Sequence, residues 1–173
     1  MREGACILAM GILLAGTSLG LAATYPVNMT GAQESPPADP DGYATGTITL
    51  DPALNGGTIS WSINYFNIDG TSLSGFHIHG PVVPPNPNAG VFVNLGVGSS
   101  MPPSGTLSGS VTGVATQINQ ILGTPNLGDV YYLNLHSLPD WPGGAVRGPL
   151  PEPATLGLLG LSAPLFVRRR RVA

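Results

Sequence analysis

The stretch TISWSINY, residues 58–65, alternates strictly between apolar and polar side chains. The large apolar side chains fall on one face of an extended chain and the small polar ones on the other: Ile59, Trp61, Ile63 and Tyr65 against Ser60, Ser62 and Asn64. This period of two is the pattern of a β-strand with one buried face. The stretch therefore predicts a sheet that covers a hydrophobic interior.

Weaker segments of the same kind lie on both sides of this stretch. We expect further strands at residues 25–30, 45–50, 76–79, 91–95, 106–111 and 130–135. Turn sequences rich in Gly, Pro, Asn and Asp separate them, and the chain holds 25 Gly and 18 Pro. Only Ala115–Leu122 has helical spacing. The prediction is an all-β domain, a Greek-key sandwich or barrel of about seven or eight strands with one short helix.

Composition limits the number of domains and the kinds of partner. A chain of 173 residues suits one domain of ordinary size. Charged residues make up 9% of the chain, there is no Lys, and Arg147 is the one Arg between the two ends. Nucleic-acid binding is excluded, because neutralising phosphates needs a cluster of cations.

The N-terminus has the layout of a secretory signal peptide. Arg2 precedes the apolar run ACILAMGILLAGTSLGL, residues 5–21, and small residues suited to cleavage follow at Ala22 and Ala23. We assign residues 1–23 to the signal and 24–150 to the folded body. The alternative, a retained membrane anchor, needs a somewhat longer apolar run. The one cysteine, Cys6, falls inside the signal, so the mature chain has no disulfide.

Residues 151–173 resemble the PEP-CTERM sorting signal of exosortase-processed bacterial proteins. The motif, the apolar run 154–167 and the basic stop occur in the expected order, with the motif at Pro151, Glu152 and Pro153 and the stop at Arg168, Arg169, Arg170 and Arg171. As a helix the apolar run measures about 21 Å against a hydrocarbon core of about 30 Å, which favours a transient inner-membrane tether. The resemblance implies Sec-type export, cutting by an exosortase-like membrane peptidase, and a place in the cell envelope or outside the cell.

The body resembles the CHRD domain first described in chordin. The motifs MTGAQE, HIHGP, GVFVNL, YLNLH and PGGAVRG occur in the family's order, and the likeness covers about Met29–Leu150. It implies an extracellular or envelope module without an established enzymatic activity. We therefore expect a non-enzymatic binding or structural protein, with extracellular polysaccharide as one candidate partner.

The chain has 3 histidines, and we expect them to cluster in one site if the strands at 76–79 and 130–135 are neighbours. His77 and His79 share one face of a strand, because alternate residues point the same way. His136 follows the segment 130–135 and shares a face with Asn134. Sites made only of imidazoles suit copper, zinc or nickel. The alternative is a structural cluster in which the rings hydrogen-bond to turns and to each other.

A more distant resemblance bears on the same residues. The segment Gly75–His79 resembles the copper-binding strand of Cu,Zn superoxide dismutases, which implies a superoxide-dismutase-like or immunoglobulin-like fold. It also implies His77, His79 and His136 as ligands of a mononuclear copper or zinc site and Arg147 as an anion-guiding residue. Alternatively, Arg147 pairs with an acid of the body. No bridging histidine, zinc-ligand cluster or disulfide cysteine matches that family.

The acidic residues predict no catalytic site. Asp39 with Asp41, and Asp69 with Asp140, are the pairs that acid–base chemistry would need. Each lies in a turn rich in Gly and Pro, where Asp usually caps its own backbone.

Overall fold

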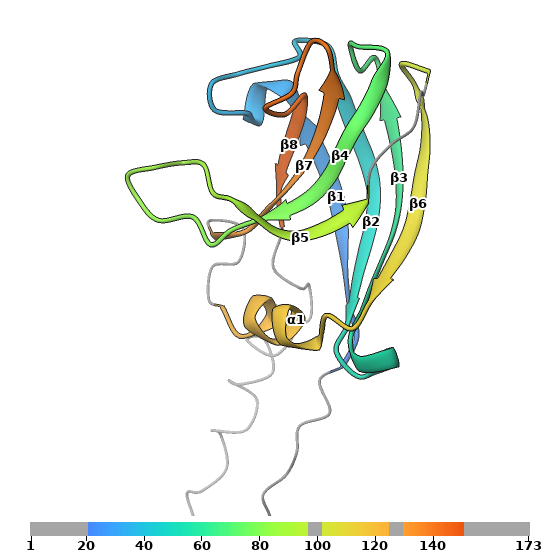
Figure 1. The fold of residues 1–173 in the computed structure, drawn as a ribbon, viewed down its shortest axis with the longest axis vertical. Coiled ribbons are helices and arrows are strands. Elements are labelled where there is room, and N and C mark those ends of the chain that lie inside the picture. Colours follow the sequence, from blue (N-terminus) through green and yellow to red (C-terminus); the bar gives the residue numbers. More distant parts are fainter. Residues whose placement is uncertain (1–20, 97–101, 125–129, 151–173) are drawn as a thin grey trace, which may run out of the picture.

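A computed structural model describes residues 21–96, 102–124 and 130–150 (Figure 1). Its strands are β1 (Ala23–Thr30), β2 (Tyr43–Asp51), β3 (Thr58–Phe66), β4 (Ser72–His79), β5 (Val91–Gly96), β6 (Gly105–Thr112), β7 (Tyr132–Leu138) and β8 (Val146–Pro149). Within the described ranges the structure also has the helix α1 (Ala115–Leu122) and two 3-10 turns, η1 (Gly31–Gln33) and η2 (Leu54–Gly56). Most of the expected signal and the whole expected sorting tail lie outside the described residues.

All the described strands form one 8-stranded antiparallel sheet in the order β5-β4-β7-β8-β1-β2-β3-β6. β4 pairs with β7 and β3 with β6, so the connections cross the ends of the sheet as in Greek-key folds. The two edge strands, β5 and β6, approach each other without pairing. The sheet is therefore a nearly closed barrel, and the predicted all-β class is confirmed.

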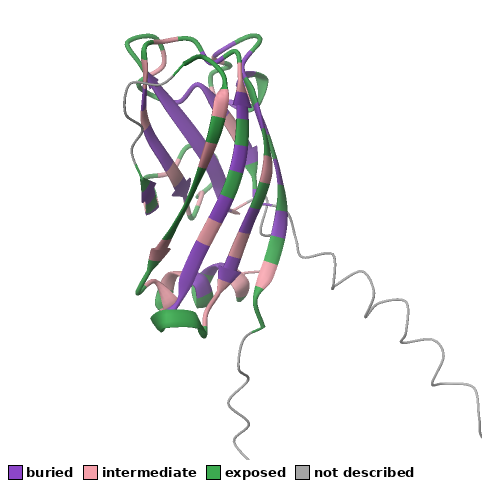
Figure 2. Ribbon diagram, turned by 90° about the vertical axis from the view of Figure 1, so that its right-hand side faces the viewer, coloured by how far each residue is buried: buried purple, intermediate pink, exposed green. Residues whose placement is uncertain are grey.

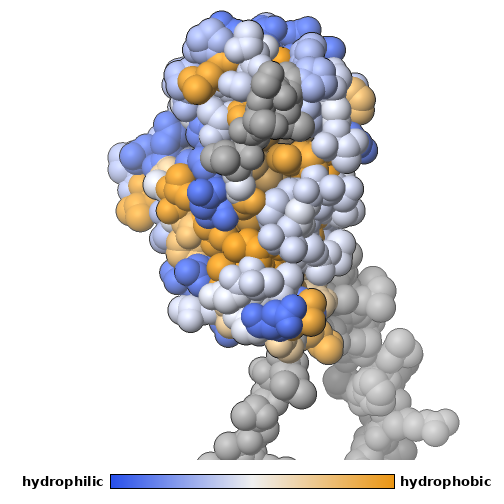
Figure 3. Space-filling model, turned by 45° about the vertical axis from the view of Figure 1, so that its right-hand side comes forward, coloured by the Kyte–Doolittle hydropathy of each residue, from blue (hydrophilic) through white to orange (hydrophobic). Residues whose placement is uncertain are grey.

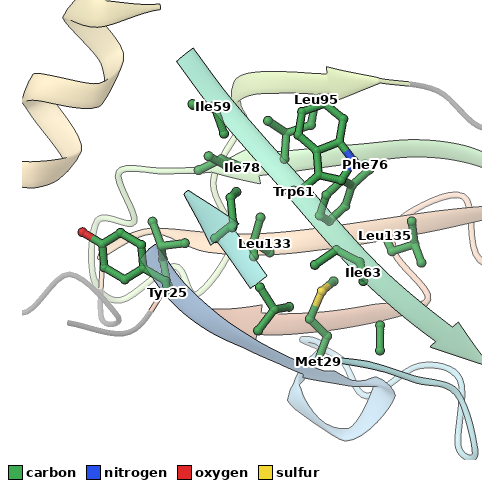
Figure 4. Close-up of a cluster of buried hydrophobic side chains, with 14 of the residues drawn as sticks. Tyr25, Met29, Ile59, Trp61, Ile63, Phe76, Ile78, Leu95, Leu133 and Leu135 are labelled. Carbon is green, nitrogen blue, oxygen red and sulfur yellow. The ribbon is translucent and has the colours of Figure 1, made fainter. Parts of the chain in front are cut away.

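The interior of the barrel is filled mainly by alternate residues of the strands, and β6 adds only partly buried side chains. Buried and exposed segments follow one another along the strands in Figure 2. In β3, Ile59, Ile63 and Tyr65 are at most 1% exposed and Trp61 is 9% exposed. The rings of Trp61 and Phe76 lie 6.0 Å apart, edge to face, within this core (Figure 4). The face that the sequence predicted as buried is the buried face.

Helix α1 lies at one end of the barrel (Figure 1). Ile118 and Ile121, both on its predicted apolar side, are fully buried in the core. Gly57 allows the helix to begin this close to the sheet, because a Cβ there would lie 2.1 Å from the Ala115 nitrogen. Its φ of +95° also disfavours any other residue. The predicted bounds of the helix are confirmed.

The largest differences from the sequence prediction are in three strands. β7 begins at Tyr132 and ends at Leu138, rather than spanning 130–135, and β4 begins already at Ser72. A shift of register between Leu73 and Gly75 interrupts the alternation that would have revealed the start of β4. β8 was not singled out, because its four residues are too few to show a period.

The side of the barrel between the edge strands carries apolar surface. Figure 3 looks at this side and shows hydrophobic atoms gathered in the middle of the face. Within the described ranges no helix is long and apolar enough to cross a membrane. The expected apolar segment 154–167 lies outside those ranges.

Candidate metal site

Strands β4 and β7 carry the three histidines on the face of the sheet that points away from the core. Phe76 and Ile78 of β4 are buried in the core, so the alternation turns His77 and His79 to the opposite face. In β7, Leu133 and Leu135 are core residues and His136 lies on the other side. The antiparallel register places His136 opposite Gly75, and the side chains of both β4 histidines reach its ring.

The structure brings the three rings together. Nδ1 of His77 lies 3.1 Å from Nε2 of His136, and that Nε2 lies 3.4 Å from Nε2 of His79. One ring nitrogen from each histidine lies within 4.8 Å of the other two. His79 and His136 are buried and His77 is half-buried. The cluster therefore offers three nitrogen ligands at one point, and the structure contains no ion.

Gly75 makes room for this arrangement. A Cβ at Gly75 would lie 2.5 Å from Cε1 and 2.8 Å from Nε2 of the His77 ring. The ring thus lies over the backbone of Gly75, which is also the residue paired with His136. Any side chain at position 75 would push the His77 ring away from its neighbours.

Two backbone carbonyls orient the buried rings. The oxygen of Ala89, in the β4–β5 loop, lies 2.9 Å from Nδ1 of His79. The oxygen of Pro142, in the β7–β8 loop, lies 3.1 Å from Nδ1 of His136. A carbonyl only accepts, so we assign the proton of each neutral ring to Nδ1. Both Nε2 atoms then carry lone pairs, and that of His136 faces Nε2 of His79 as well as Nδ1 of His77.

Burial keeps the histidines neutral. Desolvation, with smaller contributions from His136 and His79, lowers the pKa of His77 from 6.5 to about 4. Desolvation also lowers the pKa of His79 and of His136, although the Ala89 and Pro142 carbonyls oppose the shift. Neutral imidazole is the form that binds metal ions. The site is thus set for ligation at neutral pH.

Tyr132 and Arg147 form a stack beside the histidines. The Tyr132 ring lies parallel to the His79 ring at 5.0 Å, and Cζ of Arg147 lies 3.4 Å from the centre of the Tyr132 ring. Arg147 also donates to Oδ1 of Asn88 at 3.0 Å and to the oxygen of Pro87 at 2.8 Å. These hydrogen-bond partners are neutral, so in the described structure Arg147 holds the β4–β5 loop. Sequence reasoning missed Tyr132, although it shares the period-two face of Asn134 and His136.

A second missed group lies next to Arg147. Glu34 follows η1, is 9% exposed, and its Oε1 is buried without a hydrogen-bond partner among the described residues. Burial raises its pKa to about 7, although Arg147, the Ser35 backbone and Asn134 act to lower it. Glu34 is the last residue of the motif MTGAQE, but its neighbours along the chain do not indicate that its side chain is buried.

Of the four acids weighed from the sequence, Asp39 binds turn backbone through its carboxylate. Asp39 is fully buried, and its Oδ1 accepts from the Gly42 nitrogen at 3.0 Å while its Oδ2 accepts from the Asp69 nitrogen at 2.9 Å. Asp39, Asp41 and Asp69 also come within 4.8 Å of one another. The charge of Asp39 is the largest cause that raises the pKa of Asp69. Both oxygens of the central carboxylate are used by backbone donors, as turn capping requires.

Comparison with known families gives one match. The sequence model of the CHRD domain matches residues 25–150, which is the whole barrel apart from the first residues of β1. No curated protein and no solved structure matches the chain.

Proposed function

The chain belongs to the CHRD domain family, and on that premise we propose that it acts outside the cytoplasm, as a secreted or cell-envelope module. The family match supports this, because the domain is typical of extracellular proteins. The terminal segments of the sequence support it independently, one as an export signal and the other as a sorting tail. The proposed role is binding or structural, without catalysis by the domain itself.

Delivery would follow from the two ends of the chain. A Sec-type pathway would export the chain and remove residues 1–23, and the arginines 168–171 would hold the tail on the cytoplasmic side. An exosortase-like peptidase would then cut near Pro151–Pro153. Mass spectrometry of the protein recovered from the cell surface or the medium tests this delivery. A chain recovered there with its C-terminal arginines intact would contradict it.

A specific observation favours a second function, the binding of one copper or zinc ion. The Nε2 lone pairs of His79 and His136 face each other at 3.4 Å, and the Ala89 and Pro142 carbonyls hold the ring protons on the far side. Two acceptor nitrogens in contact repel each other, and a cation bound by both would remove that repulsion, whereas in a purely structural cluster Nδ1 of His77 would donate to Nε2 of His136. His77 completes the set of three ligands.

The donor set fits the chemistry of these ions. Neutral imidazoles bind copper and zinc well, and the mature chain offers no thiolate to direct a softer metal to the site. Second-sphere carbonyls on Nδ1 of ligating histidines are a common feature of metal sites. Copper would supply one-electron redox chemistry, and zinc would supply a structural or Lewis-acid centre. The residues of this chain would hold the ion, exclude water through burial, and fix the ring orientation.

Metal analysis of the purified mature protein tests this function. We expect about one equivalent of copper or zinc per chain, and calorimetric titration of the stripped protein with Cu(II) and Zn(II) should show one site. Replacing His79 or His136 by Ala should abolish the tight site. Since the chain has 3 histidines and all lie here, no other imidazole can substitute.

The same titration separates the two readings of the cluster. If the stripped wild type takes up neither ion at micromolar concentration, the histidines are structural and the metal function is wrong. In that case the His→Ala variants would lose stability without any change in metal content. The proposal of an extracellular module would still stand, because it depends on the family match and on the export signals.

A further inference from the structure

A pocket of about 290 Å³ lies between the loop after η1 and the β7–β8 loop. Its walls combine three prolines and an indole ring with two acids, namely Pro36, Pro37, Pro142, Trp141, Glu34 and Asp140. These two loops lie side by side at one end of the barrel in Figure 1. The volume is near the lower end of the range for small-molecule sites, about 300–1,000 Å³.

We propose that this pocket binds a small organic ammonium ion, with Glu34 and Asp140 as its counter-charges and Trp141 as its aromatic wall. Both charged residues that line the pocket are acids, and no Lys, Arg or His lines it. An anionic ligand would therefore meet only like charge. Indole rings and prolines suit the carbon body of such a ligand, and an indole face attracts a cation.

Glu34 is a built part of the pocket. It is 9% exposed, and its Oε1 has no hydrogen-bond partner among the described residues. Oδ1 of Asn134, close by, is also a buried acceptor without a partner there. Oε1 of Glu34 lies 2.4 Å from the position that a Cβ of Gly144 would take, and Oδ1 and Nδ2 of Asn134 each lie 2.6 Å from it. A buried acceptor without a hydrogen bond lowers the stability of the fold. A bound ammonium that donates to the Glu34 carboxylate would remove that loss.

The positive charge nearest to Glu34 acts from outside the pocket. Arg147 lowers the pKa of Glu34, but its guanidinium is held by Pro87 and Asn88 and does not line the pocket. Burial is the larger effect and raises the pKa of Glu34 to about 7. A bound ammonium favours the ionised carboxylate. Binding near pH 7 should therefore release a proton.

This proposal does not depend on a metal at the histidines. The Pro142 carbonyl reaches His136, but the proposed ligand contacts come from Glu34, Asp140 and Trp141. Ammonium binding should be the same in the presence of a chelator that strips the histidine site. The two proposals can therefore fail separately.

The test uses a pair of probes of the same shape, cyclohexylammonium and the neutral cyclohexanol. Calorimetric titration of the mature protein at pH 7, in two buffers of different ionisation enthalpy, gives both the affinity and the number of protons released. We expect cyclohexylammonium to bind at least about tenfold more tightly than cyclohexanol, with proton release. Glu34→Gln should weaken the ammonium about tenfold and abolish the proton release.

Two further variants keep the test decisive if Glu34→Gln does not fold. Asp140 is exposed, so Asp140→Asn leaves the core intact and should weaken the ammonium about threefold. Asp41→Asn removes an exposed acid outside the pocket and should leave the affinity unchanged. Equal binding of the two probes, no heat from either up to about 10 mM, or equal losses in the Asp140 and Asp41 variants would overturn the proposal.

Discussion

Nε2 of His79 and Nε2 of His136 lie 3.4 Å apart, and Nδ1 of each ring contacts a backbone carbonyl, that of Ala89 or Pro142. The loops β4–β5 and β7–β8 thus take part in the site through main-chain atoms. The strands supply the imidazoles, and the loops decide which nitrogen of each buried ring is free. Changes that move a ring without removing it are the sharpest tests of this arrangement.

Gly75→Ala should weaken metal binding more than it weakens the fold. The new Cβ would lie 2.5 Å from Cε1 of His77, at the far end of a half-buried side chain that can turn away. We expect a loss of metal affinity of about tenfold or more, because one of three ligands is displaced. Calorimetric titration with Zn(II) and a thermal melt measure the two effects. Gly90→Ala is the matched control, since a Cβ there meets nothing within 4 Å. Equal metal affinities in the two variants would contradict the placement of His77.

Trp61→Ala should destabilise the barrel strongly. Trp61 is 9% exposed and its ring lies edge to face with Phe76 at 6.0 Å in the core. Removing a buried aromatic ring costs about 3–5 kcal/mol, a large part of the stability of an ordinary domain. Denaturant unfolding measures the difference. Tyr43→Ala is the control, because Tyr43 is 40% exposed and stacks on Phe66 at the surface, where about 0.5–1.5 kcal/mol is expected. Similar losses of unfolding free energy in the two variants would mean that the Trp61 ring is not a major part of the core.

The core could be predicted from the sequence where alternation is long enough to read. The nine residues of β3 span more than four periods, so the inward face was clear. The four residues of β8 span only two periods, and one of them, Gly148, has no side chain. The inward face of β8 could therefore not be recognised in the sequence. The pairing of β4 with β7 depends on strands distant in the chain. No local pattern determines such a register, so the meeting of His136 with His77 was an expectation until the structure described it.

Arg147→Leu should loosen the β4–β5 loop. Arg147 donates to Pro87 and Asn88, and the next residue, Ala89, donates its N–H to the Tyr132 hydroxyl at 3.1 Å. Losing the two guanidinium bonds should speed hydrogen exchange at the Ala89 amide about five- to tenfold. The amide of Leu135, in the middle of β7, is the internal control and should not change. Unchanged exchange at Ala89 would show that Arg147 does not hold the loop.

The candidate site was only half visible in the sequence. Histidines two apart on a strand indicate a shared face, and this placed His77 and His79 together. The carbonyls of Ala89 and Pro142 carry no sequence signal, because every residue has one. The space that Gly75 leaves becomes meaningful only when the ring above it is known. Side chains were therefore predictable and the backbone groups that orient them were not.

His77 and Glu34 should make opposing contributions to the pH dependence of stability in the metal-free protein. Burial lowers the pKa of His77 from 6.5 to about 4, so between these values the unfolded chain binds more protons than the folded one. The contribution of His77 to the free energy of unfolding is complete above about pH 6.5 and is lost as the pH falls toward 4. Burial raises the pKa of Glu34 from 4.5 to about 7, so there the folded chain binds more protons. The contribution of Glu34 to the free energy of unfolding therefore falls as the pH rises from 4.5 to about 7.

Two neutral variants separate these contributions. Unfolding free energies from denaturant titrations between pH 4 and 8, measured with a chelator present, give one curve for each protein. The wild-type curve minus that of His77→Gln should rise with pH between about 4 and 6.5. The wild-type curve minus that of Glu34→Gln should fall between about 4.5 and 7. A flat difference for His77 would mean that its ring protonates as freely in the fold as in the unfolded chain. Its nitrogen would then be open to solvent, rather than enclosed with the other two imidazoles.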